Sequence, residues 1–390
     1  MRTAILFLCV GAFAGGSVAS GEEAAALEIR FCPQAQVRTF PLESQRGVQS
    51  LLLQNAALIN RGTSPVELTA VDLELLQDGR VIDTRQLGGA DLTRAGASGA
   101  ALQQSGMMKM FAFQFCGTAL VGEGTTLAGP TLAPQQAMLL AQQPFAYRGK
   151  RDTLRLRAHG HRDGHEFEAS ATLPVSATFA KTAFRFPLQG VWFAAVGPTM
   201  HTGHRWALPE EFGYDIARFG DGNSSHRGTG QRFQDYYAYG ATVRAAADGV
   251  VLATANDQAE NTALLRRPAE SAEAYGARMQ ELQGALLSKG AAAIAGNFVI
   301  LDHGGSEYSL YAHLVPGSVR VKVGEHVAGG APIGMLGSSG NSTEPHLHFQ
   351  VCDAPDPLGC AGIPVEFQDV ALPYADFPRP LQSGDVVVAK

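Results

Sequence analysis

Two histidines, His346 and His348, stand one residue apart in GSSGNSTEPHLHFQV, residues 337–351. A Gly- and Ser-rich turn leads there into alternating apolar and polar residues, which predicts a strand whose successive side chains point to opposite faces. The two imidazoles therefore share one face, where neighbouring side chains lie roughly 6 to 7 Å apart. At that spacing one histidine can bind a metal ion while the other reaches a water molecule or substrate atom on that metal.

A bare His-x-His pair more often marks an edge strand with two solvated histidines. Here the context favours a functional site. Upstream, NFVILDHGGSEYSLYAHL, residues 297–314, predicts two strands joined by a Gly-Gly turn, the second ending in His313. Between this segment and the His-x-His pair, VRVKVGEHVAGGAPIGMLG, residues 319–337, has the rhythm of short strands and glycine turns.

The ordered set GNFVILDHG, YAHL, VKVGEHVAGGAPIG and GNSTEPHLHF closely resembles the lysostaphin/LytM-type zinc metallopeptidases, which cut peptide bonds in bacterial peptidoglycan. The resemblance implies a zinc ion bound by His348 and a peptidoglycan peptide as substrate. It also implies that His313 and His346 act off the metal. They would take the proton of the attacking water, stabilise the oxyanion and hand a proton to the leaving amine. Which of the two performs which step is left open.

Members of this family supply two further zinc ligands as His-x-x-x-Asp, ahead of a YGxxVxAxxDGxV segment that is present here as residues 239–251. The resemblance places the aspartate at Asp215, but Glu211 stands four residues before it. Two alternatives follow: His204 folds back over Pro209 to supply a nitrogen, or Glu211 supplies an oxygen. His204 is preferred, because zinc at hydrolytic sites usually takes two nitrogens and one carboxylate.

Three protein ligands leave one position of a tetrahedral zinc ion for water, as hydrolysis requires. Water bound there has its pKa lowered to about 7, and the metal also polarises the scissile carbonyl. Asp302 and Tyr311 could orient the two histidines that act off the metal. His201 and His226 are further candidates for ligands, although loop positions suit both better. The expected ligand set is His204, Asp215 and His348.

A second group of histidines, His159, His161 and His165, lies in RAHGHRDGHEFEA. Residues 162–164 predict a hairpin turn, so these histidines are expected to be exposed on two paired strands. No carboxylate partner or cleft signal accompanies them in the sequence, and a functional metal is not expected there.

Length and composition indicate an ordered, exported protein. The 390 residues suffice for two domains, and the net charge of -6 offers no polybasic footprint for nucleic acid or anionic lipid. Residues 1–20, MRTAILFLCVGAFAGGSVAS, predict a secretory signal peptide cleaved near Ala19 or Ser20. Their apolar run is shorter than the about 20 residues of a membrane span. The mature protein is therefore expected in the periplasm or outside the cell, without a stable membrane span.

Beyond the signal peptide, four cysteines remain: Cys32, Cys116, Cys352 and Cys360. An even number in an exported chain predicts disulfides. Cys352 and Cys360 flank a short loop directly after the His-x-His strand, and closing it would stabilise the fold by roughly 2 to 3 kcal/mol. Cys32 would then pair with Cys116, the alternative being buried free thiols.

The predicted fold is mainly β, in two domains. Residues 21–183 alternate apolar and polar residues between turns, which predicts an antiparallel β-sandwich similar to immunoglobulin-like accessory modules. Residues 184–390 are expected to form a LytM-like antiparallel β domain. An insertion, residues 256–295, interrupts the family pattern, and the apolar spacing within 275–286 predicts an amphipathic helix packed beside the cleft.

The sequence therefore predicts an exported zinc endopeptidase that hydrolyses peptidoglycan by metal-activated water. The alternative is a catalytically degenerate relative that binds peptidoglycan or activates another wall hydrolase. The missing histidine four residues before Asp215 keeps this alternative open. The joint presence of His313, His346 and His348 argues against it.

Overall fold

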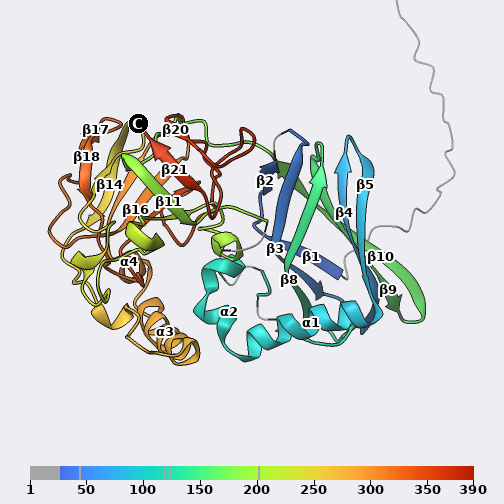
Figure 1. Ribbon diagram of the computed structural model, residues 1–390. Helices are drawn as coiled ribbons and strands as arrows, with labels where there is room; N and C mark the ends of the chain where they lie inside the picture. The colour runs from blue at the N-terminus through green and yellow to red at the C-terminus, as the bar shows by residue number, and fades with distance from the viewer. Residues whose placement is uncertain (1–26, 44, 118–119, 123, 201–202) are drawn as a thin grey trace, which may run out of the picture.

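The computed structural model describes residues 27–43, 45–117, 120–122, 124–200 and 203–390. The expected signal peptide, residues 1–20, lies outside these ranges. Figure 1 shows two β-rich parts side by side, the N-terminal sandwich (residues 27–176) and the C-terminal lobe (residues 184–389).

The strands of the N-terminal sandwich alternate between core and outer residues. In β4, Leu73 and Leu75 join the hydrophobic core, whereas Asp72 and Glu74 point to the opposite face. This period of two explains why the segment forms a strand. The strands are β1 (Leu27–Cys32), β2 (Val37–Glu43), β3 (Val48–Asn60), β4 (Val66–Gln77), β5 (Arg80–Gly88), β6 (Thr125–Thr126), β7 (Thr131–Leu132), β8 (Gln136–Arg148), β9 (Thr153–Arg162) and β10 (His165–Ser176).

The order of these strands is β5-β4-β9-β10-β2-β3-β8-β6, with β1 on β3 and β7 on β4. Most neighbours are antiparallel, as the sequence predicts. Two short contacts, β10 with β2 and β6 with β8, are parallel instead. The β9–β10 hairpin turns at Asp163 and Gly164, both with positive φ, which confirms the predicted turn.

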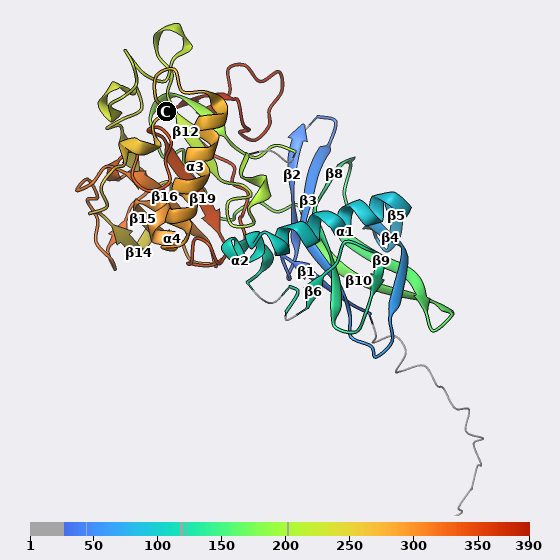
Figure 2. The same ribbon diagram turned by 90° about the horizontal axis from the view of Figure 1, so that it is seen from below.

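Helices follow β5 and run toward the C-terminal lobe (Figure 2). They are α1 (Gly89–Gln104), α2 (Met107–Met110) and the 3₁₀ helix η2 (Ala112–Phe115). Helix α1 approaches β8 closely at Gly99, where a Cβ would lie 2.5 Å from the Leu139 carbonyl oxygen. A side chain there would push the helix away from the sheet.

The C-terminal lobe is an antiparallel sheet in the order β17-β14-β15-β16-β19-β12-β11-β21-β20, beside a two-stranded β13–β18 pair. Strand β21 adds the C-terminal segment to β11. The strands are β11 (Gly190–Val196), β12 (Tyr214–Ala217), β13 (Thr242–Arg244), β14 (Gly249–Ala255), β15 (Asn297–Asp302), β16 (Tyr308–Leu314), β17 (His326–Val327), β18 (Pro332–Met335), β19 (Leu347–Cys352), β20 (Val370–Ala371) and β21 (Val386–Ala389).

The insertion forms the predicted helix, α3 (Ala272–Leu287), followed by α4 (Ala291–Ala295). Ser271 caps α3 by accepting a hydrogen bond from the Ala274 amide, and Met279 is its buried apolar residue. Short 3₁₀ helices complete the lobe: η3 (Gly203–Trp206), η4 (Asp221–Asn223), η5 (Phe233–Asp235) and η6 (Thr262–Leu264). In the described part of the chain, every helix is too short or too polar to cross a bilayer.

Both predicted disulfides are present, Cys32–Cys116 and Cys352–Cys360. The first ties β1 to the segment just after η2, and the second closes the loop after β19. The fold is therefore mainly β, as expected.

Candidate metal centre

Neighbouring strands of the C-terminal lobe bring two of the expected ligands together. Asp215 in β12 and His348 in β19 are direct cross-strand partners. The Asp215 Oδ1 atom lies 2.9 Å from His348 Nδ1. Side chains that face each other on adjacent antiparallel strands stay in register, so the sheet itself holds this pair.

The third expected ligand comes from the loop between β11 and β12. His204 lies in η3, and its Nε2 atom is 3.2 Å from Asp215 Oδ2. One ligand atom each of His204, Asp215 and His348 lies within 4.8 Å of the others. Elsewhere among the described residues, no group of three histidine, cysteine or acidic side chains meets the same distance limit.

The Glu211 carboxylate does not join the ligand cluster, as it would if it replaced the histidine ligand. Instead it forms an ion pair with Arg205, with 2.9 Å between Arg205 Nη2 and Glu211 Oε1, and the residue is 3% exposed. Gly213 makes room for the turn that brings His204 back, since a Cβ at this glycine would lie 3.4 Å from His204 Nδ1.

The hydrogen bonds of His348 select its tautomer. Its Nε2 atom is 2.8 Å from Gln350 Oε1, while the Gln350 amide nitrogen donates to the Pro357 carbonyl. Nε2 of His348 therefore carries a hydrogen, and in the neutral ring the Nδ1 lone pair faces the Asp215 carboxylate. A cation between these two acceptors would satisfy both, and two imidazole nitrogens with one carboxylate are a donor set that zinc accepts.

Two further histidines border the same cluster. The ring centres of His313 and His346 are 4.8 Å apart, and His346 Nε2 lies 3.4 Å from Asp215 Oδ1. His313 has its Nδ1 atom 2.8 Å from the Ser339 carbonyl oxygen, and His346 has its Nδ1 atom 2.8 Å from the Glu344 carbonyl oxygen. In both rings Nδ1 is the donor to the backbone, so Nε2 is the nitrogen left for chemistry.

The backbone of His313 is in the left-handed region, with φ of 65° at the end of β16. Non-glycine residues rarely adopt this conformation, and such strain is concentrated at functional sites. The strand therefore turns at the residue that faces His346.

Electrostatic coupling separates the pKa values of the cluster in its metal-free form. Burial lowers the pKa of His204, but Asp215 and Glu210 outweigh this effect and raise it to about 9. Burial would raise the pKa of Asp215, yet His204 and His346 hold it well below its ordinary value. The Asp215 carboxylate is thus charged over the whole physiological range.

His313 and His346 shift in opposite directions. Burial lowers the pKa of His313 well below the ordinary value, and the charges of His346 and His348 lower it further. For His346, burial lowers the pKa, but Asp215 and the Glu344 carbonyl raise it overall. Two adjacent imidazoles with opposite proton affinities suit a site that must both accept and donate protons.

A cavity of about 340 Å³ opens onto these side chains. The insertion supplies one wall through Gln283 of α3 and Ile294 of α4, and Trp206 and Glu210 contribute from the loop that carries His204. Together with the five site residues, these groups make a concave site of the size that a small peptide segment fills.

The prediction that Asp302 and Tyr311 orient the two histidines beside the cluster is wrong. The Tyr311 hydroxyl accepts a hydrogen bond from the Ala246 amide, and the Asp302 carboxylate accepts one from Gly304, so neither orients the histidines. That role falls to the Ser339 and Glu344 carbonyls and to Gln350. Gln350 could have been found, because it follows His348 by two residues on the same strand face. A contact made by a backbone carbonyl leaves no signal in the sequence, because every residue has this group.

The other histidines near this region stay apart from the cluster. His226 lies in an isolated β-bridge with Tyr236 and lines a separate pocket, and His201 is outside the described residues.

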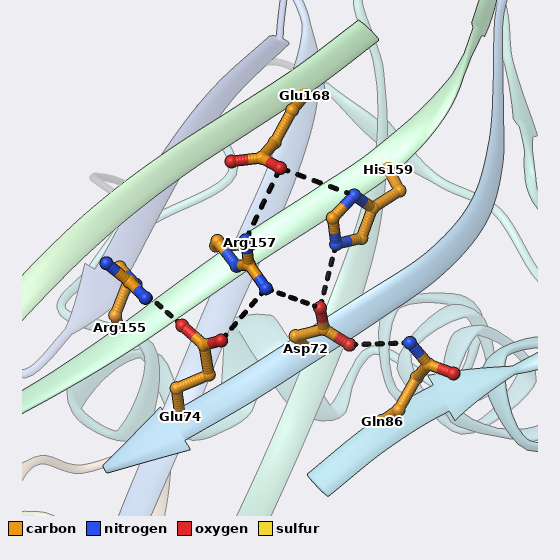
Figure 3. Close-up of polar contacts among 7 residues, drawn as sticks. All are labelled: Asp72, Glu74, Gln86, Arg155, Arg157, His159 and Glu168. Carbon is orange, nitrogen blue, oxygen red and sulfur yellow. Dashed lines mark hydrogen bonds and ion pairs between the residues drawn. The ribbon is translucent and has the colours of Figure 1, made fainter. Parts of the chain in front are cut away.

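His159 of the β9–β10 hairpin belongs to a charged network rather than to a metal site (Figure 3). The expectation that no carboxylate accompanies the hairpin histidines is wrong for His159. Its Nε2 atom lies 2.8 Å from Asp72 Oδ2, and its Nδ1 atom 3.6 Å from Glu168 Oε2. These carboxylates come from the neighbouring strands β4 and β10, and cross-strand partners far apart in sequence cannot be seen in a local motif.

Arginines complete this network. Arg157 bridges Asp72 and Glu74 at 3.2 and 3.0 Å, and Arg155 also binds Glu74. The acidic and basic side chains neutralise one another across the sheet (Figure 3). We therefore assign this network a structural role in the sheet.

Comparison with known proteins supports the resemblance for part of the C-terminal lobe. Residues 281–358 match the model of Peptidase family M23. This range contains His313, His346 and His348, whereas His204 and Asp215 precede it. The resemblance to lysostaphin/LytM-type peptidases that the sequence motifs indicate is confirmed.

Two curated relatives match short stretches of the chain. Peptidoglycan DD-endopeptidase ShyA of Vibrio cholerae serotype O1 is 37% identical over 81 residues, which are 21% of this chain and 17% of that protein. DD-carboxypeptidase/endopeptidase Mpg of Neisseria meningitidis serogroup B is 34% identical over 115 residues, which are 27% of this chain and 24% of that protein. The matched regions span a quarter or less of these relatives.

One similar solved structure is the catalytic domain of a mutant of the prophage-encoded M23 protein EnpA from Enterococcus faecalis. It is 17% identical, with a TM-score of 0.28, and the match covers 47% of this chain and 95% of that one.

Proposed function

We propose that this protein is an exported zinc-dependent endopeptidase that hydrolyses peptide bonds in bacterial peptidoglycan. The observation that carries the proposal is the convergence of His204, Asp215 and His348, whose ligand atoms lie within 4.8 Å of one another. Zinc ligands of this number and type leave one position open, which distinguishes hydrolytic from structural zinc sites.

Zinc held by these residues would lower the pKa of a bound water to about 7 and polarise the scissile carbonyl. His313 and His346 lie off this ligand set, and each directs its Nε2 atom away from a backbone carbonyl that fixes Nδ1. They are placed to accept the proton of the attacking water, to stabilise negative charge on the carbonyl oxygen and to protonate the leaving amine. Asp215 is close enough to hold a proton on His346 Nε2, at 3.4 Å.

The substrate class is proposed from the relatives. ShyA is named as a peptidoglycan DD-endopeptidase and Mpg as a DD-carboxypeptidase/endopeptidase. Two disulfides in the structure fit an oxidising location, such as the periplasm or the cell exterior, where peptidoglycan is reached.

The degenerate alternative rested on the absence of a histidine four residues before Asp215. His204 approaches Asp215 from a more distant position in the sequence, which supports a complete ligand set and hence the enzyme. A protein that only binds peptidoglycan has no need for three ligands together with two further histidines.

Zinc content and peptidoglycan digestion test the proposal together. The purified chain should carry about one zinc ion and release soluble peptide fragments from purified sacculi, measured by mass spectrometry. EDTA should abolish the release, and zinc should restore it. His348→Ala should lose both metal and activity, whereas the matched control His165→Ala, at an exposed hairpin histidine, should keep both.

Two results would contradict the enzyme. A His348→Ala chain that retains zinc and activity would show that the site lies elsewhere. A wild-type chain that binds zinc and sacculi but releases no fragments would favour the degenerate alternative.

A further inference from the structure

The position of His204 depends on the N-terminal sandwich. Asp215 and His348 sit on paired strands, but His204 lies in a loop that we call the ligand segment, residues 203–213. One backbone hydrogen bond ties this segment to the rest of the C-terminal lobe, from the Gly362 amide to the Leu208 carbonyl. Arg205 Nη1 also donates to the Thr199 carbonyl within this lobe. Several further hydrogen bonds run to the sandwich, and one of them goes from Gln142 Nε2 to the Trp206 carbonyl.

Two buried glutamines of the sandwich form hydrogen bonds with the ligand segment, within η3 and just after it. The Gln54 side-chain nitrogen donates to the Arg205 carbonyl at 2.7 Å, and the Leu208 amide donates to Gln114 Oε1 at 2.8 Å. The glutamines also bind each other, since Gln114 Nε2 donates to Gln54 Oε1 at 2.8 Å. Gln54 is 0% and Gln114 is 4% exposed, so water does not compete for these bonds.

Both glutamines are themselves fixed within the sandwich. Gln54 belongs to β3, the strand that pairs with β8. Gln114 belongs to η2, where its carbonyl accepts a hydrogen bond of 2.7 Å from Asn55 and where the Cys32–Cys116 disulfide follows two residues later. Gln54 and Gln114, which we call the glutamine relay, thus hold the ligand segment in a fixed position relative to the sandwich.

Arg205 adds a second anchor next to the ligand. Its fully buried guanidinium donates to Ser50 Oγ at 2.9 Å and pairs with Glu211. Apolar contacts act in the same direction, because Leu208 packs in a cluster with Ile59 and Leu139 of the sandwich. The segment therefore presents His204 to the metal site while its neighbours are embedded in the other part of the molecule.

We propose that Gln54 and Gln114 are positioning residues for the zinc ligand His204, so that the N-terminal sandwich is a structural part of the metal site. This inference rests on the proposed function. Without the two amides, His204 would have to be ordered at the moment of zinc binding, and the affinity would fall by the entropy of that ordering. The sandwich would then control hydrolysis without touching the substrate.

Zinc affinity of the full-length chain tests this role directly, by competition with a chromogenic chelator. Gln54→Met and Gln114→Met keep side-chain volume and remove the relay, and each should weaken zinc binding by about 10- to 100-fold. Asn60→Leu is the matched control. Asn60 is also a buried amide of β3, but its hydrogen bonds run to the Ser64 and Leu132 carbonyls within the sandwich. It should lower the urea midpoint and leave zinc affinity unchanged.

A double-mutant cycle separates positioning from general destabilisation. In a His204→Ala background, Gln54→Met should cause no further loss of zinc affinity, because its effect passes through His204. Cobalt substitution supplies a spectroscopic readout, since Gln54→Met should shift the visible Co²⁺ bands toward those of His204→Ala. If Gln54→Met does not fold, Ser50→Ala removes the Arg205 contact, together with the bonds of the Ser50 hydroxyl to the Phe40 and Thr199 carbonyls. It should weaken zinc binding about threefold or more.

The outcomes are distinct. Wild-type zinc affinity in both glutamine variants, or losses that add fully to that of His204→Ala, would overturn the positioning role while leaving the proposed function intact. A wild-type chain that binds no zinc would instead contradict the proposed function itself.

Discussion

Asp215 and His348 face each other across β12 and β19, with Asp215 Oδ1 2.9 Å from His348 Nδ1. These two side chains are set by strand register alone, whereas His204 joins them from a loop. The candidate metal centre thus combines a rigid pair with a third ligand whose location depends on packing elsewhere.

The first ligand can be identified by comparing His204→Ala with Glu211→Ala. The loss of a direct ligand should reduce zinc affinity by more than the about 10- to 100-fold typical of outer-shell changes. Glu211→Ala should bind zinc at saturating metal, but it leaves Arg205 buried without its partner and should lower the free energy of unfolding by about 3 to 5 kcal/mol. Chelator competition and urea denaturation measure the two effects. Loss of the saturating zinc stoichiometry in Glu211→Ala alone would favour the carboxylate as ligand.

Gln350 should tune the site through His348. Its Oε1 atom accepts the hydrogen of His348 Nε2 and leaves Nδ1 for the metal. Gln350→Leu removes this acceptor and should weaken zinc binding by about 10- to 100-fold, whereas Gln350→Glu keeps an acceptor and should bind more tightly than Gln350→Leu. Isothermal titration with zinc compares the variants. Equal affinities of the Leu and Glu variants would show that the hydrogen bond has no effect on the metal.

The two disulfides should differ in their contribution to stability. Cys32–Cys116 closes a loop with a sequence separation of 84, and Cys352–Cys360 one of 8. On the chain-entropy model, their removal by paired Cys→Ala substitutions should cost about 4 to 5 and about 2 to 3 kcal/mol respectively. Urea denaturation of both double variants under non-reducing conditions measures this difference. The reverse order would show that loop entropy does not govern these bonds.

Acid should weaken the N-terminal sandwich through Asp72. Burial raises the pKa of this carboxyl, but Gln86, His159 and Arg157 lower it below 3.8 overall. A carboxylate with a depressed folded pKa stabilises the fold above its unfolded pKa, and this contribution is lost as the pH falls through the lower folded value. Asp72→Asn should therefore cost roughly 1 to 3 kcal/mol at pH 7 and progressively less below pH 3.8.

Denaturant titrations between pH 7 and pH 2.5 test the Asp72 effect. Glu166→Gln is the control, because Glu166 is on the same hairpin with its side chain 92% exposed. Its unfolding free energy should follow that of the wild type at every pH. A constant difference between Asp72→Asn and the wild type across the acid range would contradict the assigned titration.

Features that depend on local periodicity and composition could be predicted from the sequence alone. Alternation predicted that His346 and His348 face the same side, and both border the metal cluster, although β19 begins only at Leu347. Helical spacing predicted α3, and an even cysteine count predicted the two disulfides. The first two follow from how a side chain points relative to its own backbone, and the third from the even number of cysteines beyond the predicted signal peptide. The ordered glycine and histidine motifs then indicated a metallopeptidase-like lobe, which the match over residues 281–358 supports.

The contacts between groups far apart in the sequence could not be predicted from local patterns and appear only in the folded chain. Folding brought His204 rather than Glu211 to Asp215, because the ligand segment turns back at Gly213 while Arg205 and Glu211 are buried against the sandwich. It also gave His159 a carboxylate partner from another strand. Such contacts depend on the packing of two separate β structures, and a local pattern records the direction of a side chain but not the partner that folding brings to it.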